Sequence, residues 1–260
     1  ENNPQGIAFN NDGTKMFVLG TDGDDVNEYT LSTGFDVSTA LFVDSFSVVL
    51  QDTSPGDIAF NNDGTKMFMV GIRFNQVSEY TLSTGFDVST ALFVDNFSGT
   101  AQDTAPTGLA FNNDGTKMFV LGLIGDDVNE YTLSTGFDVS TALFVDSFSV
   151  VLQDTSPGDI AFNNDGTKMF MVGIRFNQVS EYTLSTGFDV STALFVDNFS
   201  GTAQDTAPTG LAFNNDGTKM FVVGSAGDDV NEYTLATGFD LNNVLPTLSS
   251  SVPADNASSV

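Results

Sequence analysis

The residues best suited to chemistry in this sequence are acidic and amide side chains in short segments that contain glycine. The segment FNNDGTKMF, first at residues 9–17, resembles a metal-binding loop and occurs five times, always 51 residues apart. It lacks the spacing of an EF-hand loop, and the next acidic residue after Asp12 is Asp22. About three oxygens lie close together, whereas calcium takes six to eight. We therefore interpret the segment as a hairpin turn in which Gly13 supplies a positive φ.

Pairs of aspartates are a second possible metal site. Each pair follows a glycine, whose backbone carbonyl can help to hold Ca²⁺ at low affinity. The alternative is a tight polar turn in which the carboxylates accept hydrogen bonds from backbone amides. Apart from Ca²⁺, we expect no cofactor. The pairs are Asp24 and Asp25, Asp126 and Asp127, and Asp228 and Asp229.

A third set of carboxylates recurs in the segment Gln-Asp-Thr that precedes each repeat. Such a ring of acids can line the mouth of a channel, or it can accept hydrogen bonds from backbone N–H groups where a repeat begins, which we favour. The members are Asp52, Asp103, Asp154 and Asp205, and by register Glu1 takes the fifth place.

Composition argues against several kinds of function. The chain has no His and no Cys, so no Ser-His-Asp or Cys-His catalytic set can form. Paired carboxylates can hydrolyse glycosides, but the acid and the base need different environments, and these repeats are nearly identical. The net charge of −27 disfavours nucleic acid and anionic membranes, and no apolar run is long enough for membrane insertion. We expect a non-enzymatic protein, with a glycoside hydrolase as the alternative.

The elements that position these side chains repeat with a strict period. The five Tyr, the five Lys and one Pro per unit recur every 51 residues. Each unit predicts four short strands, which in the first copy are residues 6–9, 15–19, 26–31 and 41–48, with no helix-period segment. Four antiparallel strands in about 50 residues form the blade of a β-propeller.

We therefore predict an all-β, five-bladed propeller in which each blade uses its strands in chain order, A-B-C-D, and no strand crosses from the other terminus. The predicted propeller spans residues 1–251, followed by a tail or linker at 252–260. The predicted blades are residues 4–54, 55–105, 106–156, 157–207 and 208–251.

A second period of 102 residues is superposed on the first. Residues 23–120 match residues 125–222 without a difference, which indicates recent duplication of a two-repeat unit or deliberate construction. The pattern Pro-x-Gly-Ile-Ala-Phe-x-x-Asp-Gly-Thr-Lys-Met-Phe-Val resembles the repeats of YVTN, NHL and WD40-like propellers. The pattern extended by Glu-Tyr-Thr-Leu-Ser-Thr-Gly-Phe-Asp-Val-Ser-Thr-Ala, first at residues 28–40, is similar to repeats of bacterial and phage-associated proteins. This resemblance implies the fold, and the wider group includes five-bladed lectins and glycoside hydrolases.

Differences between the copies concentrate in the B–C loops and the D–A links, which emerge on one face of a propeller. The links read SVVLQ at 47–51 but SGTAQ at 98–102. The B–C loops at 72–76 and 174–178 read IRFNQ, and the others contain Gly-Asp-Asp. Arginine beside an aromatic ring suits sugar stacking or an acidic partner, although the ring could instead pack between blades. The candidate ligand-binding residues are Arg73, Phe74, Asn75, Arg175, Phe176 and Asn177.

Repeated equivalent sites favour binding by avidity over catalysis at one centre. We expect a monomeric binding module, lectin-like or protein-binding, whose partner is a carbohydrate or a protein surface. The alternative is a purely structural scaffold, natural or engineered. The resemblance suggests an extracellular, cell-surface or virion-associated location.

Overall fold

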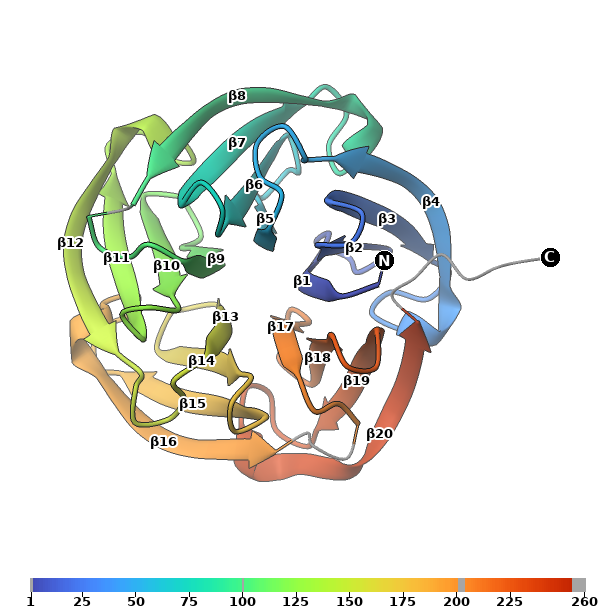
Figure 1. Ribbon diagram of the computed structural model, residues 1–260. Helices are drawn as coiled ribbons and strands as arrows, with labels where there is room; N and C mark the ends of the chain where they lie inside the picture. The colour runs from blue at the N-terminus through green and yellow to red at the C-terminus, as the bar shows by residue number, and fades with distance from the viewer. Residues whose placement is uncertain (1, 100, 201–203, 254–260) are drawn as a thin grey trace.

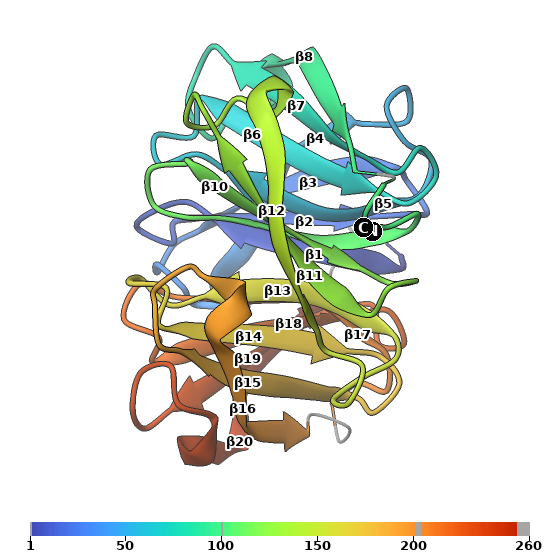
Figure 2. The same ribbon diagram turned by 90° about the vertical axis from the view of Figure 1, so that its left-hand side faces the viewer.

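The computed structural model describes residues 2–99, 101–200 and 204–253, of which 246–253 are described by their backbone only. The chain forms five four-stranded antiparallel sheets arranged as blades around a central axis (Figure 1). The first strand of each blade lies at the axis and the fourth at the periphery. The side view shows the twist of the blades, because the outer strand β12 of one blade runs across the direction of β13 to β15 in the next blade (Figure 2). The five-bladed all-β propeller predicted from the repeats is thus confirmed.

The strands of each blade follow one another in chain order. Blade 1 contains β1 (Pro4–Phe9), β2 (Lys15–Gly20), β3 (Asp25–Leu31) and β4 (Ala40–Ser47). Blade 2 contains β5 (Pro55–Phe60), β6 (Lys66–Gly71), β7 (Gln76–Leu82) and β8 (Ala91–Ser98). Blade 3 contains β9 (Pro106–Phe111), β10 (Lys117–Gly122), β11 (Asp127–Leu133) and β12 (Ala142–Ser149). Blade 4 contains β13 (Pro157–Phe162), β14 (Lys168–Gly173), β15 (Gln178–Leu184) and β16 (Ala193–Ser200). Blade 5 contains β17 (Pro208–Phe213), β18 (Lys219–Gly224), β19 (Asp229–Leu235) and β20 (Val244–Pro253).

Each C–D turn includes one turn of 3₁₀ helix, which the hydrophobic period did not predict. The five are η1 (Val37–Thr39), η2 (Val88–Thr90), η3 (Val139–Thr141), η4 (Val190–Thr192) and η5 (Leu241–Asn243). In η1 the carboxylate of Asp36 accepts a hydrogen bond from the backbone N–H of Ser38, and Val37 is buried. A segment of three residues is stabilised by this cap and by packing, so it is too short to show a helical period.

The hydrophobic core lies between blades rather than within them. Residues Met16 to Leu19 of β2 are at most 1% exposed, because blades cover both faces of this strand. One cluster joins Phe17 of blade 1 to Met67 and Tyr80 of blade 2. The same arrangement joins Phe221 of blade 5 to residues of blade 1, so face packing closes the ring without exchange of a strand.

The segment FNNDGTKMF forms the A–B turn in every blade. In the first copy, Asp12 accepts hydrogen bonds from the backbone N–H (3.0 Å) and the hydroxyl (2.5 Å) of Thr14, and these bonds lower the pKa of the carboxyl. Gly13 has a φ of 70°, and its missing side chain makes room for the ring of Phe35.

The amide of Asn11 donates to the carbonyl of Asn62, and the equivalent bonds continue around the ring until Asn215 donates to Asn11 (2.6 Å each). The constancy of the segment therefore has a structural cause, because every turn contacts the next one.

Candidate functional site

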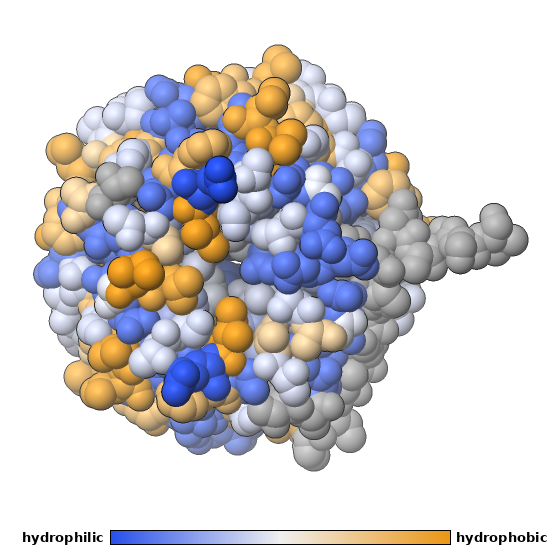
Figure 3. Space-filling view, viewed as in Figure 1, coloured by the Kyte–Doolittle hydropathy of each residue, from blue (hydrophilic) through white to orange (hydrophobic). Residues whose placement is uncertain are grey.

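The B–C loops and D–A links lie on the face turned toward the viewer in Figures 1 and 3. Apolar side chains gather on this face over blades 2 to 4, whereas the part over blade 1 is mostly hydrophilic (Figure 3). The exposed apolar residues of these connections are Val49, Leu50, Phe74, Ile124, Val151, Leu152 and Phe176. A rigid ring thus presents its variable residues together on one side.

The predicted Arg-Phe loops project from this face. Arg73 and Phe74 are exposed, and the Phe74 side chain is 51% accessible, so it does not pack between blades. The carboxylate of Asp52 accepts hydrogen bonds from the backbone N–H groups of Arg73 (3.2 Å) and Phe74 (2.9 Å). Blade 4 repeats this geometry with Asp154, Arg175 and Phe176. The backbone of each loop tip is therefore fixed while its side chains remain accessible.

The recurring aspartates of the D–A links accept hydrogen bonds from backbone N–H groups rather than line a channel mouth. Asp52 is completely buried, and it also accepts from Ser54 N–H (2.7 Å). Asp103 accepts from Ala105 N–H (2.6 Å) and from Gly125 N–H in the B–C loop (2.6 Å). Each carboxylate thus joins the start of a blade to the B–C loop of that blade, as the structural interpretation predicts. Glu1 lies outside the described residues.

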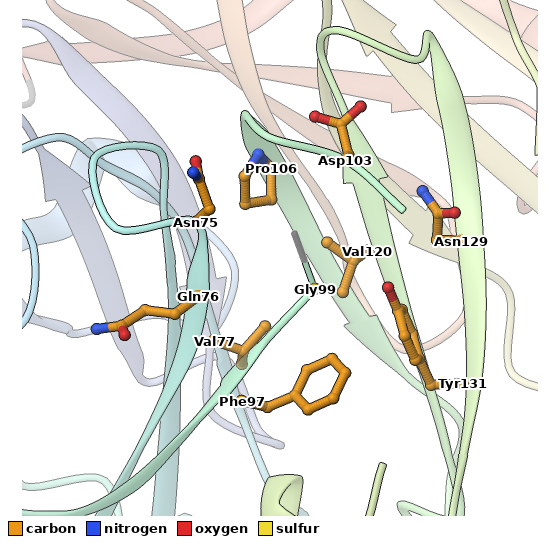
Figure 4. Close-up of a pocket in the computed structure, with 10 residues that line it drawn as sticks. All are labelled: Asn75, Gln76, Val77, Phe97, Gly99, Asp103, Pro106, Val120, Asn129 and Tyr131. Carbon is orange, nitrogen blue, oxygen red and sulfur yellow. The ribbon is translucent and has the colours of Figure 1, made fainter. Parts of the chain in front are cut away.

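A cleft opens between blades 2 and 3, where the D–A link contains Gly99. At the equivalent place between blades 1 and 2, Val48 is fully buried and fills the interface. Gly99 has no side chain, and its place is part of a narrow cleft whose interior has about 10 Å³ of room, roughly that of one water molecule. Val77, Phe97, Pro106 and Val120 are its apolar walls, and the polar groups are Asn75, Gln76, Asp103, Asn129 and Tyr131 (Figure 4).

A second narrow cleft, also with about 10 Å³ of room, occupies the same position between blades 4 and 5. Asn177, Phe199, Asp205 and Tyr233 line it, each 102 residues after its counterpart in the first cleft. The structure therefore brings the predicted residues Asn75 and Asn177 into two equivalent clefts, and each cleft adjoins one Arg-Phe loop.

The Asn at this position has a left-handed backbone, with φ of 54° at Asn75 and 52° at Asn177. With its amide nitrogen directed inward, Asn177 donates to the carbonyls of Ile174 (2.5 Å) and Thr206 (2.6 Å). Its side chain therefore ties the B–C loop to the neighbouring D–A link as well as lining the cleft.

The Asp-Asp loops place an aspartate where blades 2 and 4 have this Asn. One oxygen of Asp24 and one of Asp126 are buried without a hydrogen-bond partner among the described residues. Burial and then the neighbouring carboxylates raise the pKa of both groups. Asp228 instead accepts from Asn3 N–H (2.8 Å). The second residues of the pairs, Asp25, Asp127 and Asp229, accept from Asn27, Asn129 and Asn231.

Among the residues that the structure describes, no three acidic side chains are grouped as a metal site would require. Calcium binding by the Asp-Asp loops stays a prediction. The same residues include no helix long and apolar enough to cross a membrane.

Two features of the structure were missed from the sequence. The first is the clefts, which depend on Gly99 and on Tyr131 of the next blade. In the sequence, only the difference between Val48 and Gly99 indicates them. The second feature is Asp57 and Asp159 in the inner strands, where the other three blades have Gly6, Gly108 and Gly210. The feature of the sequence that could have identified this pair is the acidic residue itself, because a charge is costly to bury in an inner strand.

Comparison with known proteins supports the architecture. No family model matches the chain, and no curated protein matches it in sequence. Membership of the YVTN, NHL and WD40-like group therefore stays a prediction.

Solved structures match over almost the whole chain. A functionally unknown protein from Desulfotomaculum acetoxidans is 16% identical with a TM-score of 0.55, over 95% of this chain and 72% of that one. The periplasmic gluconolactonase PpgL of Pseudomonas aeruginosa is 15% identical with a TM-score of 0.51, over 96% and 70%. A chain of a nidogen/laminin complex is 11% identical with a TM-score of 0.57, over 96% and 80%. At these identities the likeness shows the fold alone.

Proposed function

We propose that this propeller is a non-enzymatic binding module that holds a repetitive carbohydrate at two equivalent Arg-Phe loops on one face, each beside a narrow cleft. The observation that carries the proposal is the coincidence, twice and 102 residues apart, of an open cleft with an exposed Arg-Phe loop. The propeller fold is consistent with this role and equally with a scaffold.

The chemistry of the two sites suits a sugar better than a reaction. An exposed aromatic ring such as Phe74 offers a face on which a sugar ring can stack, and Arg73 and Asn75 add hydrogen-bonding groups. The cleft holds only one carboxylate, Asp103, and two backbone N–H groups already occupy its oxygens. Two weak sites on one rigid body raise the affinity for a polymer by avidity.

A glycan array, repeated by surface plasmon resonance with any glycan that binds, tests this function. In the test variant, residues 72–76 and 174–178 are replaced by Leu-Ile-Gly-Asp-Asp, which the chain itself uses at 123–127. The fold tolerates both loops, because Asp103 holds the second loop as Asp52 holds the first. We expect the unaltered protein to bind and the variant, which circular dichroism should show to be folded, to lose at least tenfold in affinity.

A second variant, Gly99→Val, places in the first cleft the side chain that fills the interface at Val48. We expect it to retain one site and to lose the gain from avidity on polymeric glycan. Absence of glycan binding by the unaltered protein would exclude the carbohydrate function, and equal binding by the loop variant would exclude the Arg-Phe loops as its site. Capture of a protein ligand by the same face would favour the protein-binding alternative instead.

A further inference from the structure

The inner strands of blades 2 and 4 place two carboxyl groups against each other at the axis of the ring. Asp57 of β5 and Asp159 of β13 are 2% and 1% exposed, and their side chains are hydrogen-bonded to each other. A carboxylate is only an acceptor, so a hydrogen bond between two carboxyl groups requires a proton on one of them. The contact itself therefore specifies a shared proton.

Backbone N–H groups hold both carboxyls in place. Asp57 accepts from its own blade at Ile58 N–H (2.6 Å) and from blade 3 at Leu109 N–H (2.9 Å). Asp159 accepts in the same way from Ile160 (2.5 Å) and from Leu211 of blade 5 (2.7 Å). The pair thus links blade 2 to blade 3 and blade 4 to blade 5, as well as joining the two links across the axis.

The geometry of the ring explains why only two such acids occur. A Cβ on Gly6 would lie 2.6 Å from Asp57 Oδ1 and 2.8 Å from Asp57 Cα, and a Cβ on Gly108 would lie 2.8 Å from Asp159 Cα. An Asp therefore needs a Gly at the same position in the inner strand of the preceding blade. In a ring of five, at most two positions can be occupied without being adjacent.

We propose that Asp57 and Asp159 form a pH-sensitive lock, in which one shared proton holds the inner ring together and its loss weakens the ring. Once both groups are ionised, two negative charges face each other in a buried site, and the hydrogen bond between them is lost. The pair behaves as one titrating unit, as expected for carboxyls in contact.

The surroundings supply no opposite charge that could replace the proton. The adjoining inner strands β1, β9 and β17 contain no titratable residue. Lys66 of β6 and Lys168 of β14 are engaged by Glu79 and Glu181. Burial raises the pKa of both carboxyls, to about 7 for Asp159, and the charge of Asp159 raises that of Asp57 further.

The sign of the effect follows from this direction. A raised pKa in the folded state means that the fold binds more protons than the unfolded chain. The stabilisation is complete below the ordinary carboxyl pKa near 4. The pair loses its first proton as the pH rises through about 7, and it loses the second, shared proton only at higher pH, because the charge of Asp159 raises the pKa of Asp57 further.

Urea unfolding of the full chain from pH 5 to pH 10 tests the lock against the variant Asp57→Gly/Asp159→Gly. Glycine is the residue that the chain uses at this position in blades 1, 3 and 5, so the variant is compatible with the ring. Both proteins lose stability with rising pH through general repulsion between surface carboxylates. We expect the unfolding midpoint of the unaltered protein to fall further than that of the variant. Equal falls would overturn the proposal.

Carboxyl-carbon NMR of the unaltered protein with ¹³C-labelled aspartate gives a second measurement that does not depend on the stability of a variant. We expect two resonances to titrate far above the other aspartates and to be absent from the spectrum of the variant. Titration of all aspartates near pH 4 would overturn the proposal. A chelator provides a further control at pH 8. If it lowers the melting temperature of the unaltered protein but not that of the Asp57→Gly/Asp159→Gly variant, a bound cation takes the place of the proton, and the proposal is overturned.

Discussion

Lys219 of blade 5 donates a hydrogen bond from its ammonium group to the backbone carbonyl of Phe35 in blade 1, over 2.5 Å. The same ammonium lies 2.7 Å from Glu232, whose second oxygen accepts from Val37 N–H of blade 1. The equivalent contacts of Lys15 and Glu28 reach Phe86 and Val88 of blade 2. The first and last blades are thus joined by the same ion pair that joins their neighbours.

Replacing this lysine tests whether the ring has a weak seam. Lys219→Met leaves a nearly buried Glu232 without its cation, and we expect a loss of roughly 2–3 kcal/mol in the free energy of unfolding. The estimate lies below that for a fully buried pair, because the lysine side chain is 29% exposed. The matched control is Lys66→Met, at an interface within the chain, for which urea unfolding should give the same loss. A much larger loss for Lys219→Met would show that closure depends on this contact more than other interfaces do.

Replacing the glycine of the repeated turn should destabilise the fold. Gly115→Ala puts a side chain on a residue with φ of 69° and drives it into the ring of Phe137. We expect a loss of at least about 1–3 kcal/mol from backbone strain alone, measured by thermal or urea unfolding. Asn113→Ala in the same turn removes one exposed hydrogen bond and should cost about 0.5–1.5 kcal/mol. Equal stability of Gly115→Ala and the unaltered protein would contradict the turn geometry.

Replacing the unpartnered aspartates by asparagine should stabilise the protein. Asp24 and Asp126 have the backbone conformation of Asn177, whose amide donates to two carbonyls. The double variant Asp24→Asn/Asp126→Asn should gain about 1–3 kcal/mol in unfolding free energy, measured without calcium. If the loops bind Ca²⁺, added calcium will raise the melting temperature of the unaltered protein but not that of the variant. A loss of stability in calcium-free buffer would refute the explanation.

The tyrosines between blades should resist ionisation in alkali. Burial, and secondarily nearby aspartates, raise the pKa of Tyr80, Tyr131, Tyr182 and Tyr233 well above 10. The folded state therefore gains stability that is present below pH 10 and is lost as the pH rises above it. Ultraviolet absorbance should show these phenols ionising together with unfolding, whereas the urea-unfolded chain titrates near pH 10. Phenol ionisation near pH 10 with intact circular dichroism would contradict this burial.

The amino-acid sequence already predicts the five-bladed ring, because the strict period and the continuous apolar runs fit equivalent sheets that bury each other's faces. It also identified FNNDGTKMF as a turn and the B–C and D–A connections as the variable face. The turn follows from local backbone chemistry, and the variable face follows from the differences between copies. Neither prediction requires knowledge of how neighbouring blades pack.

Which side chains meet across blades can be seen only once the blades are packed around the axis. The contact between Asp57 and Asp159, the clefts beside Gly99, and the hydrogen bonds of Lys219 join residues that are tens to hundreds of positions apart. Such contacts depend on how closely the inner strands approach and on which neighbour has a side chain there. A repeat pattern describes each blade in isolation, so it gives neither the distance between inner strands nor the identity of the neighbouring side chain.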